Sequence, residues 1–214
     1  MKCEKKHMLL YAVTDRAWTG EKSLYEQVEQ ALKGGVSCLQ LREKNLTHDE
    51  FLSEAKEIKK LCNAYNVPLI INDDVDIAIE SGADGVHVGQ KDMDVSEARR
   101  KLGADKIIGV SARTVEQALL AEKNGADYLG VGAVFSTSTK LDAKNISHEI
   151  LRDICSAVSI PVVAIGGISK DNITQLAGTG VDGVALVSAV FSAKDIEKEC
   201  VCLRSLSESM VNGR

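Results

Sequence analysis

The sequence predicts one α/β domain in which eight short β-strands alternate with α-helices. Three observations favour this class: apolar strand-like runs recur along the whole chain, helix-length segments separate them, and no Pro/Ser-rich linker divides the chain. Strands that alternate with helices pair in parallel, because each crossover returns the chain to the same end of the sheet. Eight such units favour a closed (β/α)8 TIM barrel over an open doubly wound sheet.

The strand signal is found in eight segments. Four of them begin at a glycine, where the preceding helix should end, and continue into a β-rich run: 35–41, 82–88, 125–131 and 180–186. The other four are 9–13, 68–71, 106–110 and 161–165. The two prolines, Pro68 and Pro161, stand at strand starts, where a missing N–H is tolerated.

Helix-length segments separate these strands. We expect helices over 23–33, 47–65, 94–102, 114–123, 147–158, 170–176 and 189–203, and a shorter one after Asp74. Within 114–123, apolar Val115, Ala118 and Leu119 recur near the helical period, while Glu116 can face water. The sequence therefore predicts one barrel domain over 1–204, followed by a mobile C-terminal tail over 205–214.

Composition and charge exclude several classes of protein. Hydrophobic residues make up 44% and charged residues 27% of the 214 residues, which is enough to fill a core and argues against disorder. Asp and Glu outnumber Lys and Arg by 31 to 26, so the molecule as a whole should attract neither nucleic acid nor an anionic membrane. The six cysteines form no C-x-x-C pair, and no apolar run before Asp15 is long enough for a signal peptide or a membrane span, so we expect a cytoplasmic protein.

Polar residues suited to phosphate or metal binding follow most of the predicted strands. They form the segments 40–44, 72–74, 90–92, 137–140 and 166–167. The carboxyl ends of parallel barrel strands meet at one rim, so residues that are distant in sequence should converge on a single small-molecule site there. We take this rim as the candidate active site.

Two groups of charged residues stand out at this rim. Gln40, Arg42 and Lys44 are spaced by two, so an extended backbone points all three to one side and offers donors to a diphosphate; the alternative is a solvated edge beside Glu43 and Glu50.

Asp73 and Asp92 end the third and fourth strands, which are neighbours in a barrel, and paired carboxylates suit Mg²⁺. Asp74 competes with Asp73 for the inward position or caps the next helix. His87 is not needed as a ligand and is expected to pack along its strand.

Two later segments complete the rim. The hydroxyl-rich loop 135–142 closes on Lys140 and can bond phosphate oxygens or fold over a substrate, although it can equally be an ordinary polar connection. Gly166 and Gly167 let the backbone approach a ligand, and Ser188 stands at an expected helix start after the eighth strand. Barrels commonly bind a phosphate monoester at this place.

Together these motifs resemble the thiamine-phosphate synthase family over 9–192. The matching segments are 40–44, 71–73, 86–92, 109–111, 137–140 and 164–168, in order along the chain. The resemblance implies a (β/α)8 transferase that joins 4-amino-5-hydroxymethyl-2-methylpyrimidine diphosphate to 4-methyl-5-(2-phosphoethyl)thiazole, with Mg²⁺ as cofactor and diphosphate as the leaving group. The implied partners are these two small molecules, and a homo-oligomer remains open.

The resemblance also implies a role for each matching residue. The metal ligands would be Asp73 and Asp92. The substrate-binding residues would be Gln40 and Asn72 on the aminopyrimidine, Arg42, Lys44 and Lys140 on its diphosphate, Ser111, Thr137 and Thr139 around the diphosphate and thiazole, and Gly167, Val187 and Ser188 on the thiazole phosphate. Catalysis would rest on Arg42, Lys44, Ser111 and Lys140. The reaction needs no strong base, because the thiazole nitrogen already carries its attacking lone pair.

Three positions depart from the family pattern, and two rival functions stay open. Ala133 and Ser136 stand where the family often has proline, and Leu141 stands where it often has lysine. One rival is a thiazole tautomerase-like isomerase, which lacks the diphosphate and metal machinery. The other is a non-catalytic sensor of thiamine precursors, which would leave both metal ligands unexplained.

Overall fold

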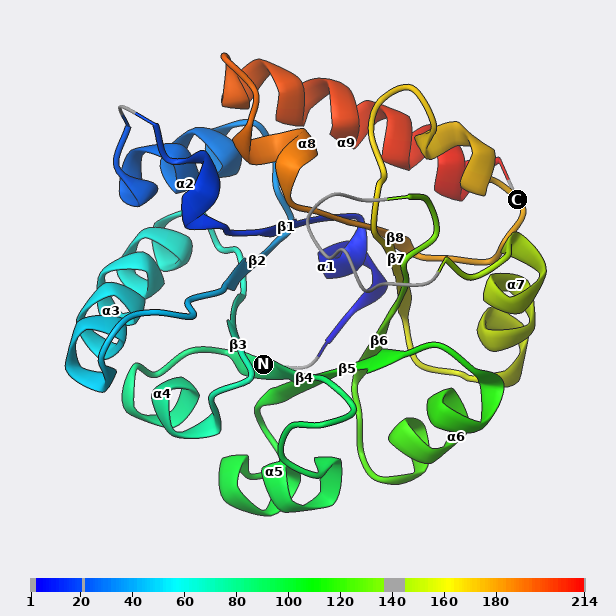
Figure 1. The fold of residues 1–214 in the computed structure, drawn as a ribbon, viewed down its shortest axis with the longest axis horizontal. Helices are drawn as coiled ribbons and strands as arrows, with labels where there is room; N and C mark the ends of the chain where they lie inside the picture. Colours follow the sequence, from blue (N-terminus) through cyan, green and yellow to red (C-terminus); the bar gives the residue numbers. More distant parts are fainter. Residues whose placement is uncertain (1–2, 21, 137–144, 214) are drawn as a thin grey trace.

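Eight parallel strands close into one barrel with helices around it (Figure 1). The computed structural model describes residues 3–20, 22–136 and 145–213. Each strand pairs with the next in sequence, and β8 pairs with β1 through Leu10 and Val184. The predicted (β/α)8 barrel is therefore confirmed.

All eight predicted strands are present. They are β1 Leu10–Val13, β2 Cys38–Leu41, β3 Leu69–Asn72, β4 Gly85–Val88, β5 Ile107–Ala112, β6 Tyr128–Gly132, β7 Val162–Ile165 and β8 Gly183–Leu186. Almost every residue in them is buried, because one face packs under the helices and the other fills the barrel. This double burial explains the near-continuous apolar runs in the sequence.

The helices begin largely where the sequence predicts them. They are α1 Lys5–Met8, α2 Leu24–Lys33, α3 His48–Ala64, α4 Val75–Glu80, α5 Val95–Leu102, α6 Val115–Lys123, α7 His148–Ala157, α8 Ser188–Phe191 and α9 Ile196–Asn212, with 3-10 turns η1 Arg16–Trp18 and η2 Ile173–Leu176. Seven of the α-helices start at a side chain that accepts a first-turn N–H: Ser23, Thr47, Asp74, Asp94, Thr114, Ser147 and Asp195. These polar caps set the helix starts.

Two helical predictions differ from the structure, and two short elements were not predicted. The segment 170–176 contains only the short η2, and 189–203 is divided into α8 and α9. The division falls at Asp195, whose side chain accepts the N–H of Lys198 and starts α9. Helix α1 and turn η1 were not predicted, because three or four residues are too few to show a helical period.

The C-terminal segment is part of the barrel wall rather than a separate tail from residue 205. Helix α9 continues to Asn212, and Leu203, Ser207 and Met210 on it are buried. The Ser207 hydroxyl donates to the Leu9 carbonyl, 2.6 Å away, immediately before β1. The expected boundary at 204 was wrong because an apolar stripe at helical spacing continues beyond it.

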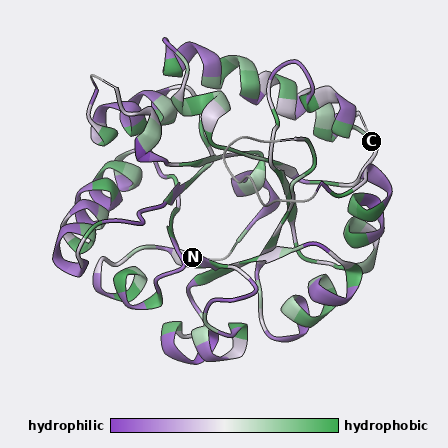
Figure 2. Ribbon diagram, viewed as in Figure 1, coloured by the Kyte–Doolittle hydropathy of each residue, from purple (hydrophilic) through white to green (hydrophobic). Residues whose placement is uncertain are grey.

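Two apolar clusters divide the core. The larger lies between the strands and the surrounding helices, whose inner faces are hydrophobic (Figure 2). The smaller fills the barrel interior and consists of Met8, Tyr11, Val13, Cys38, Ile70, Ile107, Tyr128, Val163 and Ala185. Alternate residues point to opposite sides of each strand, so Tyr11 and Val13 face inward while Leu10 and Ala12 face the helices. In the described part of the chain, no helix combines the length and apolarity needed to cross a membrane.

Candidate functional site

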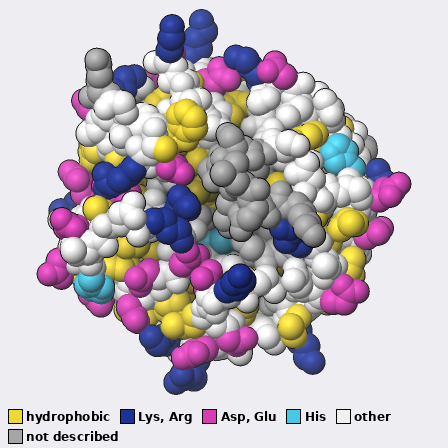
Figure 3. Space-filling model, viewed as in Figure 1, with side chains coloured by type: hydrophobic (Ala, Val, Ile, Leu, Met, Phe, Trp, Pro, Cys, Tyr) yellow, Lys and Arg dark blue, Asp and Glu magenta, His cyan; other side chains and the backbone are white. Residues whose placement is uncertain are grey.

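A cavity of about 240 Å³ lies among the carboxyl ends of the strands. Seven of the predicted site residues line it: Gln40, Arg42, Asn72, Ser111, Gly167, Val187 and Ser188. They come from the ends of β2, β3 and β5 and from the segments after β7 and β8, so the expected convergence on one rim is what the barrel produces. Charged side chains of both signs lie around the centre of this face (Figure 3).

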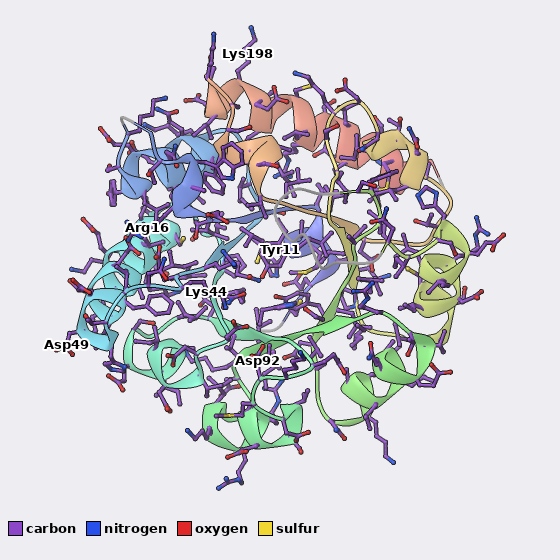
Figure 4. All side chains as sticks on the ribbon, in the orientation of Figure 1. Tyr11, Arg16, Lys44, Asp49, Asp92 and Lys198 are labelled. Carbon is purple, nitrogen blue, oxygen red and sulfur yellow. The ribbon has the colours of Figure 1, made fainter. Side chains whose placement is uncertain are left out.

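Lys44, Asp73 and Asp92 form a charged cluster at this rim. Figure 4 labels Lys44 and Asp92. Lys44 Nζ donates to Asp73 Oδ2 at 2.6 Å. Asp92 Oδ2 accepts the N–H of Gly89 at 2.7 Å and its carboxyl interacts with that of Asp73. Asp74 instead caps α4 by accepting the N–H of Ile77, so Asp73 is the acid that meets Asp92.

The two acids of this cluster titrate differently. Burial raises the pKa of Asp92 above its ordinary value, the Gly89 N–H opposes this, and the neighbouring Asp73 carboxylate raises it further. Burial would raise the pKa of Asp73 as well, but the Lys44 hydrogen bond and the Asp92 side chain hold it below its usual range. Two acids that perturb each other in this way lie close enough to share one cation.

This pair of carboxylates fits Mg²⁺ in a particular way. Within the described residues, no group of three or more His, Cys, Asp or Glu side chains could hold a metal. Mg²⁺ is commonly bound by one or two carboxylates that leave its other positions to water and substrate phosphate. The residues present therefore fit an ion held jointly by Asp73, Asp92 and a phosphorylated ligand.

Arg42 is held over the cavity by β1 and the turn that follows it. Its NH1 lies 3.2 Å from Asp15 Oδ2, and its backbone N–H donates to the Thr14 hydroxyl at 2.9 Å. Sequence reasoning missed Thr14 and Asp15. These two polar residues directly follow the first strand, as the predicted site segments follow later strands. Their position after a strand was therefore a sufficient signal to find them.

Glu43 belongs to a buried ion cluster rather than to a solvated edge. Arg16 Nε donates to Glu43 Oε2 at 2.7 Å, and Arg16 NH2 donates to Glu54 Oε1 at 2.5 Å. Burial and the nearby Glu43 carboxylate raise the pKa of Glu54 to about 7, against the opposing charge of Arg16. The cluster fixes the segment after β2 that carries Arg42 and Lys44.

Asn72 offers an unused hydrogen-bond donor to the cavity. Its Nδ2 atom is buried and has no hydrogen-bond partner among the described residues. Buried polar atoms are normally paired, so an unpaired one that borders a cavity marks a position for a ligand acceptor.

His87 lines the cavity and is within hydrogen-bonding distance of two other side chains. Its Nε2 lies 2.9 Å from Ser111 Oγ, and its Nδ1 lies 2.9 Å from the Tyr128 hydroxyl. The expectation that it only packs along its strand was therefore incomplete. Sequence gave no signal for Tyr128, because a tyrosine inside an apolar strand looks like any other core residue.

The backbone at Gly166 and Gly167 closes the other side of the cavity. Both residues have positive φ, +100° and +67°, which favours glycine. A Cβ on Gly167 would overlap the Ser136 carbonyl oxygen, so the segment after β6 packs directly on this turn. Val187 and Ser188 face the same cavity, at the start of α8. The predicted Thr137, Thr139 and Lys140 lie outside the described residues.

Comparison with known proteins identifies close relatives. The family model described as thiamine monophosphate synthase matches residues 10–190. The thiamine-phosphate synthase of Ruminiclostridium cellulolyticum is 53% identical over 203 residues, which cover 95% of each chain. That of Clostridium acetobutylicum is 52% identical over 188 residues, 88% of this chain and 89% of the relative.

Solved structures agree with this relationship. The thiamine phosphate pyrophosphorylase from Pyrococcus furiosus superposes with a TM-score of 0.89 at 42% identity and covers 97% of this chain and 98% of its own. A chain described as "Native KDPGal structure" covers 99% of this chain and 100% of its own, with a TM-score of 0.74 at 16% identity, and so shares the fold alone. The matching family model and the identity over nearly the full length show that this chain belongs to the thiamine monophosphate synthase family.

Proposed function

We propose that this chain is a transferase that joins 4-amino-5-hydroxymethyl-2-methylpyrimidine diphosphate to 4-methyl-5-(2-phosphoethyl)thiazole, giving thiamine phosphate and diphosphate. Relatives about half identical over nearly the whole chain are named thiamine-phosphate synthase. The observation that carries the proposal is the Lys44–Asp73 pair, with Asp92 beside Asp73, on the segments that follow the cavity-lining Arg42 and Asn72.

The aminopyrimidine would lie at the inner end of the cavity. Gln40 and Asn72 line it from adjacent strands β2 and β3. An aminopyrimidine carries both N–H donors and ring-nitrogen acceptors, so two amide side chains can satisfy its edge. The unpaired Asn72 Nδ2 supports this placement, because a ring nitrogen would supply the acceptor it lacks.

The diphosphate would lie at the rim, among the cations. Arg42 and Lys44 would bind its oxygens, and Lys140 would add a third positive charge from the loop after β6. Asp73 and Asp92 would hold Mg²⁺, which supplies positive charge that stabilises the departing diphosphate. Ser111 would donate its hydroxyl to the same group.

The thiazole phosphate would lie against the opposite wall. The backbone at Gly167, Val187 and Ser188 would supply the N–H groups, and a side chain at residue 167 would overlap the Ser136 carbonyl oxygen. Thr137 and Thr139 would complete the hydrogen bonds around the thiazole. This arrangement sets the thiazole across the cavity from the pyrimidine.

Such a site works by charge neutralisation and positioning. The bond between the pyrimidine methylene carbon and the diphosphate oxygen breaks, and the pyrimidine ring spreads the resulting positive charge. The lone pair of the thiazole nitrogen then forms the new carbon–nitrogen bond. Arg42, Lys44 and Lys140 stabilise the leaving anion, and the walls hold the two rings in line.

Two rival functions are less favoured. A thiazole tautomerase has no need of a paired acid and a cation at the rim, and a non-catalytic sensor would have no need of the ion pairs of Arg16 that fix the segment of Arg42 and Lys44. We also place the protein in the cytoplasm, because all six cysteines are free, as expected in a reducing compartment.

One assay tests the proposal. Purified protein is given both substrates with Mg²⁺, and thiamine phosphate and diphosphate are measured together. We expect the two products in equal amounts, and no diphosphate release when the thiazole phosphate is left out. Isomerisation of a thiazole without diphosphate release would support the tautomerase instead, and binding without turnover would support the sensor.

A further inference from the structure

A continuous chain of hydrogen bonds crosses the barrel interior and returns to the cavity. Gln40 Nε2 donates to the Tyr11 hydroxyl at 2.8 Å, and the Tyr11 and Tyr128 hydroxyls lie 2.7 Å apart. The Tyr128 hydroxyl lies 2.9 Å from His87 Nδ1, and His87 Nε2 lies 2.9 Å from Ser111 Oγ. The five residues come from β2, β1, β6, β4 and β5. Gln40 and Ser111, the two ends of this hydrogen-bond chain, line the cavity.

The two tyrosines in the middle of this hydrogen-bond chain are buried. Tyr11 is 1% exposed and Tyr128 is fully buried, within the apolar cluster inside the barrel. Their hydroxyls therefore depend on protein partners, because an unpaired hydroxyl in such surroundings is destabilising. Two apolar side chains would fill the same space without that cost, so packing alone does not account for two tyrosines here.

The strands leave room for this arrangement. A Cβ on Gly109 would overlap the Tyr128 ring, and a Cβ on Gly130 would lie 3.0 Å from His87 Cε1. The rings of His87 and Tyr128 lie 5.5 Å apart, and those of Tyr11 and Tyr128 lie 5.8 Å apart. The three rings are thus packed in fixed places, which holds their polar atoms within hydrogen-bonding distance.

Such a chain can run in only two directions. Each phenol has one proton to donate, and a neutral imidazole has one donor and one acceptor nitrogen. Where Gln40 donates to Tyr11, Tyr11 donates to Tyr128, Tyr128 donates to His87 Nδ1, and His87 Nε2–H donates to Ser111. The Ser111 proton is then left for a ligand, and so are the Gln40 oxygen and its second N–H.

We propose that Tyr11 and Tyr128 are positioning residues that fix the direction of this chain, and with it the donor and acceptor pattern that Gln40 and Ser111 present to the substrates. The inference rests on the proposed function for the identity of the substrate. Reversal of the chain would exchange the places of the Gln40 amide oxygen and nitrogen. A donor would then face the amino group of the pyrimidine, and Ser111 would lose its free proton.

The kinetic test uses Tyr11→Phe, Tyr128→Phe and Tyr65→Phe as a matched control, since Tyr65 follows α3 and does not line the cavity. We expect KM for the pyrimidine diphosphate to rise about tenfold or more in Tyr11→Phe, while KM for the thiazole phosphate changes less than about twofold. Discrimination against a 4-oxo analogue of the pyrimidine diphosphate should fall in the same variant, because the amide is then free to rotate. Tyr65→Phe should match the wild type in all three measurements.

A second readout needs no turnover. Nitrogen-15 spectra of histidine-labelled protein near pH 8 report which ring nitrogen carries the proton, and a variant lacking three of the four histidines assigns the His87 signals. We expect His87 to be the Nε2–H tautomer in the wild type and in Tyr65→Phe, and a mixture of both tautomers in Tyr128→Phe. Circular dichroism of each variant checks that it is folded.

The outcomes separate this inference from the proposed function. An Nδ1–H tautomer in the wild type would overturn the inference, as would unchanged kinetics and unchanged discrimination in a folded Tyr11→Phe. If neither substrate turns over in the wild type, the proposed function fails. A single His87 tautomer in the wild type that becomes a mixture in Tyr128→Phe would still support the directed hydrogen-bond chain. If Tyr128→Phe does not fold, the wild-type tautomer and the Tyr11→Phe kinetics decide the question.

Discussion

Lys44 Nζ lies 2.6 Å from Asp73 Oδ2 at the rim of the barrel. A cation expected to bind diphosphate is thus paired with an acid expected to bind magnesium. This contact keeps both charges satisfied while no ligand is bound. In the proposed reaction each would change partner, Lys44 to a diphosphate oxygen and Asp73 to Mg²⁺.

The first prediction concerns the metal. Asp92→Ala should reduce turnover by about a hundredfold or more and leave the fold intact, because Asp92 lies at the exposed rim and the transition state loses charge stabilisation. Diphosphate release is measured with and without Mg²⁺. Asp76→Ala is the control, since Asp76 pairs with Lys101 on the helix surface and does not line the cavity. Wild-type turnover that survives complete chelation would contradict the metal role.

The second prediction concerns the loop after β6. Lys140→Ala should raise KM for the pyrimidine diphosphate or slow departure of the diphosphate by about tenfold or more, because the leaving anion loses one positively charged partner. Lys123→Ala removes an exposed lysine at the end of α6 and serves as the control. Unchanged kinetics in Lys140→Ala would remove this residue from the site.

The third prediction separates backbone strain from steric overlap. Gly178 and Gly167 have similar φ values of +75° and +67°, but no described atom lies within 4 Å of a Cβ built on Gly178, whereas one on Gly167 would overlap the Ser136 carbonyl. Gly178→Ala should cost about 1–2 kcal/mol of stability from its left-handed conformation alone. Gly167→Ala should cost more and should also raise KM for the thiazole phosphate. Urea unfolding and steady-state kinetics measure the two effects, and equal losses in both variants would refute the overlap.

The fourth prediction concerns pH. The pKa of Glu54 is raised to about 7 in the folded protein from an ordinary value of 4.5. The folded state therefore holds a proton that the unfolded state releases, so the stability this group contributes is full below pH 4.5 and is lost as the pH rises through 7. Glu54→Gln should remove this dependence, on the order of 1 kcal/mol after solvent screening.

The free energy of unfolding is measured in urea from pH 4.5 to pH 8 for this test. Wild type should lose stability relative to Glu54→Gln across that interval. Glu57→Gln changes an exposed carboxyl on the same helix α3 and should leave the wild-type slope intact. Parallel curves for wild type and Glu54→Gln would show that Glu54 does not carry the effect.

The fifth prediction tests whether the chain end belongs to the domain. Ser207→Ala removes the buried bond to the Leu9 carbonyl and should lower stability by about 1–2 kcal/mol. Ser209→Ala removes only a bond to Ser205 on the exposed face of α9 and should change stability by less than about 0.5 kcal/mol. Equal, small effects of the two changes would mean that the last turns of α9 contribute little to the fold.

Local signals in the sequence determined the order and type of the elements. Apolar runs predicted all eight strands, and polar residues such as Ser23, Thr47 and Asp74 marked helix starts that the structure confirms, because a cap acts on N–H groups only two or three residues away. Placement of polar residues and glycines at the carboxyl ends of parallel strands was enough to collect Gln40, Asn72 and Gly167 around one cavity.

Only the tertiary structure decided which residues meet across the barrel. The partners of Glu43, His87 and Tyr11 are 27, 41 and 117 residues away in sequence at Arg16, Tyr128 and Tyr128 respectively, and no periodic pattern encodes those distances. Each contact exists because closure of the barrel brings inward-facing side chains of separate strands, or the loops at their ends, to one place. The sequence alone thus determined the strands and the rim, whereas barrel closure and desolvation decided which acid is buried and which histidine nitrogen meets serine.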